Sequence, residues 1–290
     1  MIHCVFIKKM NIKMLSKNTI KKKITEDFGN EWEAYNYSKI SYKKIKNAYK
    51  QYFNIFPTNK LKNSEGFDMG CGTGRWAKIL AKKVKKLNCI DGSQKALSVA
   101  KTNLKNYKNI NFINSLIKHD ILKKNSQDFG YCLGVLHHTP DPLYGLKVCH
   151  RILKKNAPFL LYLYYNFENK PAWFKFIWKL SNFFRNIISK FPFVIKKKVT
   201  FLIALFIYFP LAKISFYFEK IGINTDNFPL SDYRNKNFYI MSTDALDRFG
   251  TKLEKRFSKK EITTMLQMVG FYKIKFSPKT PYWVAIAYKK

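Results

Sequence analysis

Three glycines that alternate with other residues form the part of this sequence best suited to hold a ligand. Glycine lets the backbone turn sharply and lets a ligand approach main-chain N–H groups at the start of a helix. A strand-like run, 65–69, precedes the glycines, and a helix-like run, 76–80, follows them. We therefore predict a ligand-binding loop between a strand and a helix. The loop residues are Gly70, Cys71, Gly72, Thr73 and Gly74.

The acid that precedes this loop indicates which ligand it holds. Dinucleotide-binding loops have G-x-G-x-x-G spacing and place a pyrophosphate on the turn. Here the spacing is G-x-G-x-G, and the carboxylate of Asp68 would repel a pyrophosphate. A ligand with an amino-acid ammonium group suits Asp68 better. The pattern therefore points to S-adenosylmethionine (SAM) as the cofactor.

A second acid follows the next strand-like run. Asp91 ends the run 87–91 and lies about twenty residues beyond the glycine loop, where a βαβ unit delivers a carboxylate to ribose hydroxyls. Ser93 is a good N-cap for a helix over 94–106. We predict that Asp91 binds the ribose of the cofactor.

Alternating strand and helix patterns must position these residues. From residue 65 to 165 the alternation favours a parallel sheet with right-handed crossovers. At the C-terminal end, Ser258 and Glu261 form a capping box that opens a helix ending at Gly270. The other expected elements are strands at 109–114, 128–135, 158–165, 271–276 and 282–288, and helices at 24–56 and 143–153.

Taken together, these segments resemble the class I SAM-dependent methyltransferases, in the group (methyltransferase type 11) that includes the ubiquinone and menaquinone biosynthesis methyltransferases. The matching segments are 67–75, 89–93, 127–142 and 154–165. The resemblance covers roughly residues 60 to 165. It implies an α/β, Rossmann-like fold with a mostly parallel seven-stranded sheet whose last strand is antiparallel. It says almost nothing about the substrate.

The resemblance also implies which residues contact the cofactor. The set is Asp68, Gly70, Cys71, Gly72, Thr73, Gly74, Asp91, Gly92, Ser93, Leu116, Ile117, Gly134 and Val135. Gly92 and Ser93 would lie by the adenosine. Relatives often place an acid or small polar residue against the adenine, so Leu116 and Ile117, which would act through backbone and apolar packing, are a departure from the pattern.

Two histidines follow the fourth expected strand, at the sheet edge where open α/β proteins bind ligands. His137 and His138 are the candidate catalytic residues, because a neutral imidazole can take a proton from the methyl acceptor. The alternative is that the pair only shapes the loop. Asp141 is expected to cap the following helix. Candidate substrate residues at the end of the fifth strand are Tyr164, Tyr165 and Asn166, and no metal site is expected.

The charge of the chain is strongly positive. The 290 residues carry a formal net charge of +36, and only six of the 54 basic residues are arginine. Evolved phosphate readers usually rely on arginine for its bidentate fork, so a solvated lysine surface is favoured over a polyanionic partner. Nucleic acid is the less favoured partner, and an anionic membrane remains open.

Five cysteines are scattered without C-x-x-C spacing, which indicates no disulfide framework. Cys71, Cys89 and Cys132 fall in expected buried segments. The first residues lack an apolar signal region, and Met10 or Met14 would serve equally as the start. These features favour a cytoplasmic protein, with a peripheral position at the inner face of a membrane as a further expectation.

A long insertion follows the fifth strand. Aromatic and aliphatic residues recur at helical spacing from Trp173 to Phe191, with Lys and Arg largely on the other side. A second apolar run, 199–212, is about 14 residues long and contains Pro210, which falls short of the roughly 20 residues of a membrane span. We expect a helical, aromatic-rich cap that builds an apolar substrate pocket, contacts a membrane surface through residues 170–220, or does both.

The expected organisation has four parts. They are an N-terminal helical segment over the cofactor site (1–57), the SAM-binding core (58–165), the helical cap (166–250) and a C-terminal helix and hairpin (251–290). Trp32 is a candidate to close the site. The expected function is methyl transfer to a small, apolar or lipid-linked acceptor, with oxygen favoured over carbon or nitrogen. The alternatives are an RNA methyltransferase and a non-catalytic SAM-fold subunit at a membrane.

Overall fold

The computed structural model describes residues 22–38 and 40–290. The chain divides into two compact units, which we name the α/β unit (residues 1–166 with 255–290) and the helical unit (167–254). Cys4 and the candidate start residues Met10 and Met14 lie outside the described residues. Each unit has its own hydrophobic core.

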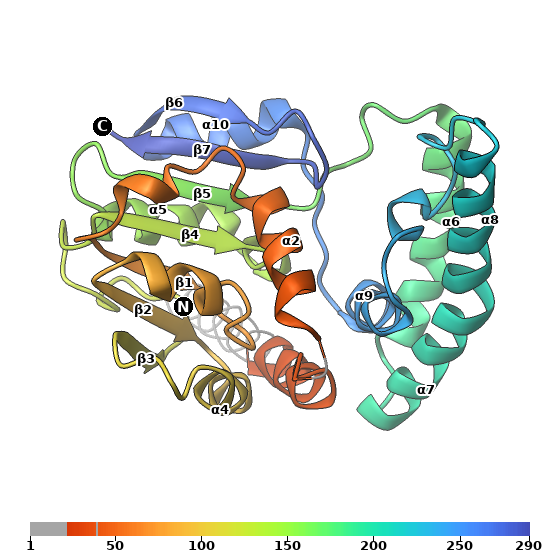
Figure 1. The fold of residues 1–290 in the computed structure, drawn as a ribbon, viewed down its shortest axis with the longest axis horizontal. Coiled ribbons are helices and arrows are strands. Elements are labelled where there is room, and N and C mark those ends of the chain that lie inside the picture. Colours follow the sequence, from red (N-terminus) through yellow and green to blue (C-terminus); the bar gives the residue numbers. More distant parts are fainter. Residues whose placement is uncertain (1–21, 39) are drawn as a thin grey trace, which may run out of the picture. The chain divides into compact units, whose positions relative to one another are not determined.

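The α/β unit is built on a seven-stranded sheet of order β3-β2-β1-β4-β5-β7-β6 (Figure 1). The strands are β1 (Glu65–Met69), β2 (Lys86–Asp91), β3 (Ile110–Asn114), β4 (Phe129–Leu133), β5 (Pro158–Tyr162), β6 (Phe271–Phe276) and β7 (Val284–Lys289). Strands β1 to β5 are parallel, and β7 is antiparallel to both β5 and β6. The predicted sheet, including its antiparallel last strand, is confirmed. This order brings the carboxyl ends of β1, β2 and β4 to one edge.

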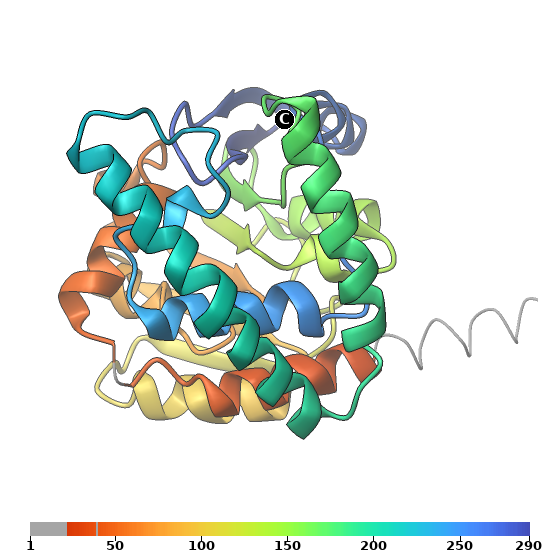
Figure 2. The same cartoon turned by 90° about the vertical axis from the view of Figure 1, so that its right-hand side faces the viewer.

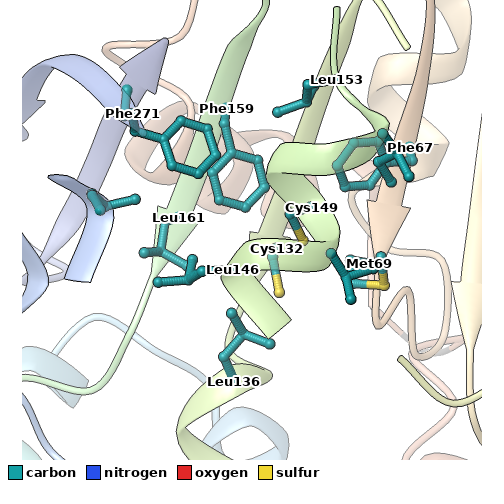
Figure 3. Packing of buried hydrophobic residues seen from close by; sticks show 14 of the residues in the cluster. Phe67, Met69, Cys132, Leu136, Leu146, Cys149, Leu153, Phe159, Leu161 and Phe271 are labelled. Carbon is teal, nitrogen blue, oxygen red and sulfur yellow. The ribbon is translucent and has the colours of Figure 1, made fainter. Parts of the chain in front are cut away.

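One face of the sheet is covered by α5 (Pro142–Ile152) and α10 (Lys259–Val269). The rings of Phe67, Phe159 and Phe271 follow one another across this face, with centroids 6.2 and 5.2 Å apart (Figure 3). Cys132 and Cys149 are buried in the same cluster as free thiols. Their burial explains why these cysteines behave as small apolar residues.

The other face is covered by α2 (Tyr42–Tyr52) and the short α3 (Ala77–Leu80), while α4 (Gln94–Asn103) packs against β2 and β3 (Figure 1). Phe53 and Phe56, which follow α2, place their rings 5.3 Å from Tyr131 and 6.3 Å from Phe129 of β4. All five residues of β4 are buried, because both faces of this central strand are covered.

The N-terminal segment differs from the expected single helix over 24–56. A helix covers residues 22–34, residues 35–38 are not helical, and α2 begins at Tyr42. The single helix expected over 24–56 was therefore wrong, because the chain leaves the helical conformation after residue 34 and resumes it at Tyr42. Tyr37 in the break has φ 60°, a left-handed conformation that no continuous helix can contain.

The expected helix caps are confirmed. Ser93 accepts a hydrogen bond from the Ala96 N–H (3.3 Å), and Asp141 accepts one from the Tyr144 N–H (3.0 Å). Ser258 and Glu261 form the complete capping box of α10. At the other end of α10, Gly270 takes φ 102°, which favours glycine.

The helical unit contains α6 (Ala172–Ile188), α7 (Phe193–Ile203), the π-helical turn η4 (Ala204–Tyr208), α8 (Phe209–Lys220) and α9 (Phe238–Gly250). Helices α7, η4 and α8 form one continuous helix of 28 residues, Phe193–Lys220, which we name the long helix. Figure 2 shows α6 and the long helix as two rods that diverge from the turn joining them. Residues of both helices pack with α9 in the core of this unit.

The continuity of the long helix corrects the sequence-based argument that residues 199–212 are too short to span a membrane. Pro210 does not end the helix, because it follows the π-helical turn, where the altered hydrogen bonding accommodates a residue without an N–H. Among the described residues, the long helix alone is long and apolar enough to cross a membrane by length and composition.

Candidate cofactor and acceptor site

The glycine loop follows β1 and is held against the end of β2. The N–H groups of Gly70 and Cys71 donate to the Ile90 carbonyl oxygen at 2.8 and 3.0 Å. Gly70, Gly72 and Gly74 all have positive φ (80°, 52° and 75°), which explains why glycine stands at each position. A Cβ on Gly70 would lie 2.4 Å from Val135, so the turn after β4 packs directly against the loop.

Asp91 joins this loop to the turn after β2. Its Oδ2 accepts a hydrogen bond from the Gly72 N–H at 2.9 Å, and its Oδ1 accepts one from the Ser93 N–H at 2.8 Å. Burial raises the pKa of Asp91, and the two backbone hydrogen bonds oppose that rise. The structure thus brings together Asp91, Gly72 and Ser93, three residues predicted to contact the cofactor.

Asp68 lies below the glycine loop and is 1% exposed. Its Oδ2 has no hydrogen-bond partner among the described residues. Burial raises the pKa of Asp68 to about 8, an effect that Tyr131 opposes and the nearby Asp91 carboxylate adds to. A buried carboxyl with an unused oxygen is suited to receive a cationic ligand group, which would restore its ionised form. The methionine ammonium of SAM fits this requirement.

The remaining predicted cofactor residues divide into two groups. Leu116 lies against the second loop, because a Cβ on Gly92 would be 2.8 Å from its side chain. Ile117 instead packs against the core shared by the sheet, α5 and α10, so the structure does not place it with Leu116. At the end of β4, Gly134 has φ 80°, and a Cβ there would meet no atom within 4 Å. Open space therefore lies next to Gly134.

The helix of residues 22–34 lies across the same edge. The Trp32 ring is 3.3 Å from the position that a Gly72 Cβ would take, and Thr25 is 3.3 Å from that of Gly92. Lys95 and Glu33 form an exposed ion pair at 2.8 Å, a contact that contributes little to stability. The first helix thus contacts both predicted cofactor loops.

His137 and His138 lie in the short helix η3 (Leu136–His138) and are both buried. The His137 ring stacks on Tyr164 with centroids 3.8 Å apart, and its two nitrogens have no hydrogen-bond partner among the described residues. Burial holds the pKa of His137 well below its usual range, and the neighbouring His138 and Arg256 lower that pKa further to a smaller extent. His137 is therefore neutral at physiological pH, which is the form that accepts a proton.

The three candidate substrate residues do not lie together. Tyr164 contacts the histidine pair, whereas the Tyr165 ring lies 5.7 Å from Tyr282 near the C-terminal hairpin. Asn166 is held by a backbone hydrogen bond to Phe257. Of the three, Tyr164 alone is placed with the predicted catalytic residues.

Further aromatic residues, which the sequence patterns did not single out, join this group. We name as the aromatic cluster the side chains linked by successive ring contacts of 3.8 to 5.9 Å, namely Phe28, His138, His137, Tyr164, Tyr162 and Tyr52. The Arg256 guanidinium lies over the Tyr164 ring at 5.1 Å. Among the added residues, Tyr162 is the one that the sequence could have indicated, because it stands two residues before Tyr164 and side chains at this spacing lie on the same face of a strand. Phe28 and Tyr52 arrive from the N-terminal helices, which no local pattern connects to β5.

Comparison with known proteins agrees with this geometry. Residues 67–161 match the family model described as "Methyltransferase domain". The ubiquinone biosynthesis O-methyltransferase of Coxiella burnetii (strain Dugway 5J108-111) is 33% identical over 116 residues, covering 36% of this chain and 49% of that protein. The enzyme of the same name from Histophilus somni (strain 2336) is 31% identical over 105 residues, covering 34% of this chain and 44% of that protein.

Among solved structures, a SAM-dependent methyltransferase from Aquifex aeolicus superposes with a TM-score of 0.45 at 16% identity, covering 86% of this chain and 98% of that one. The chain spans about half the length of the curated relatives it matches. The sequence match, the strand order and the loop with its two acids agree over residues 67–161. Residues 67–161 therefore form a methyltransferase domain, whose cofactor is S-adenosylmethionine.

Proposed function

We propose that this protein transfers a methyl group from SAM to a small acceptor. The observation that carries the proposal is the buried Asp68 carboxyl, which has an unused oxygen beneath a loop of three positive-φ glycines. Asp68 would hold the ammonium group of the cofactor, Asp91 would hold the ribose hydroxyls, and Gly92 with Leu116 would lie by the adenine. When bound, SAM supplies an electrophilic methyl group on its sulfonium.

The acceptor is proposed to be an apolar or lipid-linked molecule that is methylated on oxygen. The aromatic cluster supports an apolar acceptor, and the curated relatives with matching sequence are named O-methyltransferases. The open space beside Gly134 lies at the end of β4, three residues before the first of the histidines. An acceptor seated there would be close to residues that can take its proton.

His137 is proposed as the general base for the acceptor hydroxyl. Its neutral imidazole is held by the Tyr164 ring, and both of its nitrogens remain available for a hydroxyl. Packing of the histidine pair against Phe28 and Tyr164 also keeps water from the acceptor oxygen. Positioning and water exclusion account for part of the rate enhancement, and proton removal adds a factor of about 100 to 10,000.

A lipid-linked acceptor is itself held in a bilayer, so the proposed activity favours an enzyme that works at the cytoplasmic face of a membrane. The absence of C-x-x-C spacing and the free buried cysteines support a reducing compartment.

Calorimetric titration of the purified protein with SAM and with S-adenosylhomocysteine (SAH) tests the cofactor. We expect both to bind with dissociation constants of about 1–100 µM, and the Gly72→Val variant to lose binding because its side chain would meet Trp32. An unaltered circular dichroism spectrum provides the control for folding. Failure of the wild-type protein to bind either compound would overturn the proposal.

The acceptor chemistry is tested with labelled SAM and a panel of phenols and catechols that carry apolar tails. On an acceptor that reacts, His137→Gln should lower kcat by about 100-fold or more with SAH binding unchanged. Thr102→Ser, on the exposed side of α4, provides the control. The neighbouring Asn103 is left unchanged, because its amide donates to the Thr73 carbonyl in the glycine loop. Turnover by His137→Gln equal to that of the wild type would show that the histidine only shapes the loop.

A further inference from the structure

The helical unit exposes an extensive apolar surface. On α6 and the long helix, large apolar side chains are left uncovered, among them Trp173 (49% exposed), Phe176 (68%), Phe183 (60%), Val194 (65%), Phe206 (69%) and Tyr217 (62%). We name these six residues, with the helical surface that carries them, the apolar face. Soluble proteins rarely expose apolar groups so densely unless the surface binds something.

The same helices bury polar residues. Arg185 of α6 is 7% exposed, and its guanidinium donates to the Thr251 carbonyl at 2.9 Å. On the long helix, Lys196, Thr200 and Ser215 are almost fully buried, and Lys196 donates to the Gly250 carbonyl at 3.2 Å. These few polar residues thus lie in a core that is otherwise apolar, while large aromatic side chains of the same helices face outward. A helix whose outer side meets water would place its aromatic residues inward.

The charges around the apolar face have one sign. Residues 169–218 contain no Asp or Glu and nine Lys or Arg, of which Arg185 and Lys196 are buried and the other seven are not. Lys190, Lys197 and Lys198 are exposed at the turn between α6 and the long helix. Lys213 lies 5.4 and 5.8 Å from the rings of Phe209 and Phe216, so its stem covers apolar surface while its ammonium stays at the edge.

We propose that the apolar face docks the protein onto an anionic lipid bilayer. Aromatic rings fit the boundary between head groups and acyl chains, and the surrounding lysines contact anionic head groups, each adding about 1 kcal/mol. A second copy of the chain is a poorer occupant, because it would bring the same positive charge and the chain as a whole carries +36.

The packing of α9 indicates that the helices lie on the bilayer and do not span it. Ala204, Tyr208 and Ala212, in the middle of the long helix, pack with Met241, Ala245 and Phe249 of α9. If the long helix crossed the bilayer, α9 would enter the hydrocarbon together with Asp244, Asp247 and Arg248, at a cost of several kcal/mol. On a surface, α9 stays on the aqueous side of the helices that carry the apolar face.

Flotation of the full-length protein with vesicles tests the docking, and it does not depend on the proposed methyl transfer. One set of vesicles is phosphatidylcholine alone, and the other is an equal mixture with phosphatidylglycerol. We expect flotation mainly with the anionic vesicles, weakening with added salt and reversed by alkaline carbonate. Phe176→Glu combined with Phe206→Glu should lower the bound-to-free ratio at least about tenfold.

Met268→Glu provides the matched control, because Met268 is a comparably exposed apolar residue (67%) on α10 of the α/β unit. This control should float like the wild type, and SAH binding by all variants should be unchanged. Equal flotation with neutral vesicles, or an unaffected double variant, would overturn the docking. Retention after alkaline carbonate would overturn the surface position in favour of a span. Loss of SAH binding in the wild type would count against the methyltransferase alone.

Discussion

At the scale of single residues, the buried carboxyl of Asp68 lowers the stability of the protein at neutral pH but favours the binding of a cationic ligand group. Its folded-state pKa is about 8, against an ordinary value of 3.8. Between these values the folded protein holds a proton that the unfolded chain has released. The contribution of Asp68 to the free energy of unfolding is therefore greatest below pH 3.8 and falls as the pH rises towards 8. An acid kept at such a cost is expected to serve a ligand.

The Asp68→Asn variant tests whether this carboxyl lowers stability and favours ligand binding. The amide keeps the shape but does not ionise, so at neutral pH the variant should be more stable than the wild type by about 1–3 kcal/mol. It should also lose most of its affinity for SAH, because the ammonium no longer meets a carboxylate. Urea unfolding and calorimetry measure the two effects. A variant that is less stable at neutral pH and binds SAH normally would contradict the role assigned to Asp68.

The pH dependence of binding gives a second test of the same residue. A cationic ligand group favours the ionised carboxyl, so binding should release a proton below the folded-state pKa. In the wild type, SAH affinity should rise by up to tenfold per pH unit from about pH 6 and level off near pH 8. Titrations across this range, with Asp68→Asn as the flat reference, measure the slope. A wild-type affinity that does not change with pH would be inconsistent with an ammonium at this carboxyl.

At the scale of elements, the ends of the helices position the site more than their interiors do. The box of Ser258 and Glu261 fixes where α10 begins, directly after the segment in which the Phe257 N–H donates to the Tyr164 carbonyl at 2.8 Å. In the same segment Arg256 lies over the Tyr164 ring. The start of α10 thus helps to hold one wall of the aromatic cluster.

Ser258→Ala should lower the free energy of unfolding by about 1 kcal/mol, because the Glu261 N–H loses its acceptor. Ser98→Ala, at an exposed position inside α4, should change it by less than about 0.5 kcal/mol. Urea unfolding of the two variants makes the comparison. Equal effects of the two substitutions would show that the box does not stabilise α10.

At the scale of the whole molecule, the two units have separate cores and separate proposed tasks. The core of the α/β unit includes Phe67 and Leu266, and that of the helical unit includes Tyr208 and Met241. Separate cores favour separate cooperative transitions. The predicted cofactor residues all belong to the α/β unit, so a ligand should act on one transition.

Differential scanning calorimetry should therefore show two unfolding transitions. SAH at about 100 times its dissociation constant should stabilise one of them by about 2.7 kcal/mol and leave the other in place. The Met241→Ala variant should lower the transition that SAH does not move, because it removes a buried side chain from the helical core. A single transition that shifts as a whole with SAH would show that the units unfold together.

Much of the α/β unit was predictable from local patterns. The glycine loop, the acids Asp68 and Asp91 and the caps at Ser93 and Ser258 each depend on residues close in sequence, where turn and cap chemistry act directly. The break at Tyr37 was not predictable, because the residues on either side of it favour helix. Similarly, Pro210 was read as an interruption, but a π-helical turn accommodates it.

The sequence by itself determined the order of strands and helices and the cofactor, because short-range periodicity and loop chemistry specify them. It also placed the proposed cofactor residues at the ends of β1 and β2. Only the tertiary structure decided that Phe28, Tyr52 and Tyr164 meet around the histidines, and that Ile117 turns towards the core. It also revealed which side of α6 and the long helix stays uncovered. Such contacts join residues far apart in the chain, so they follow from packing, which no local pattern encodes.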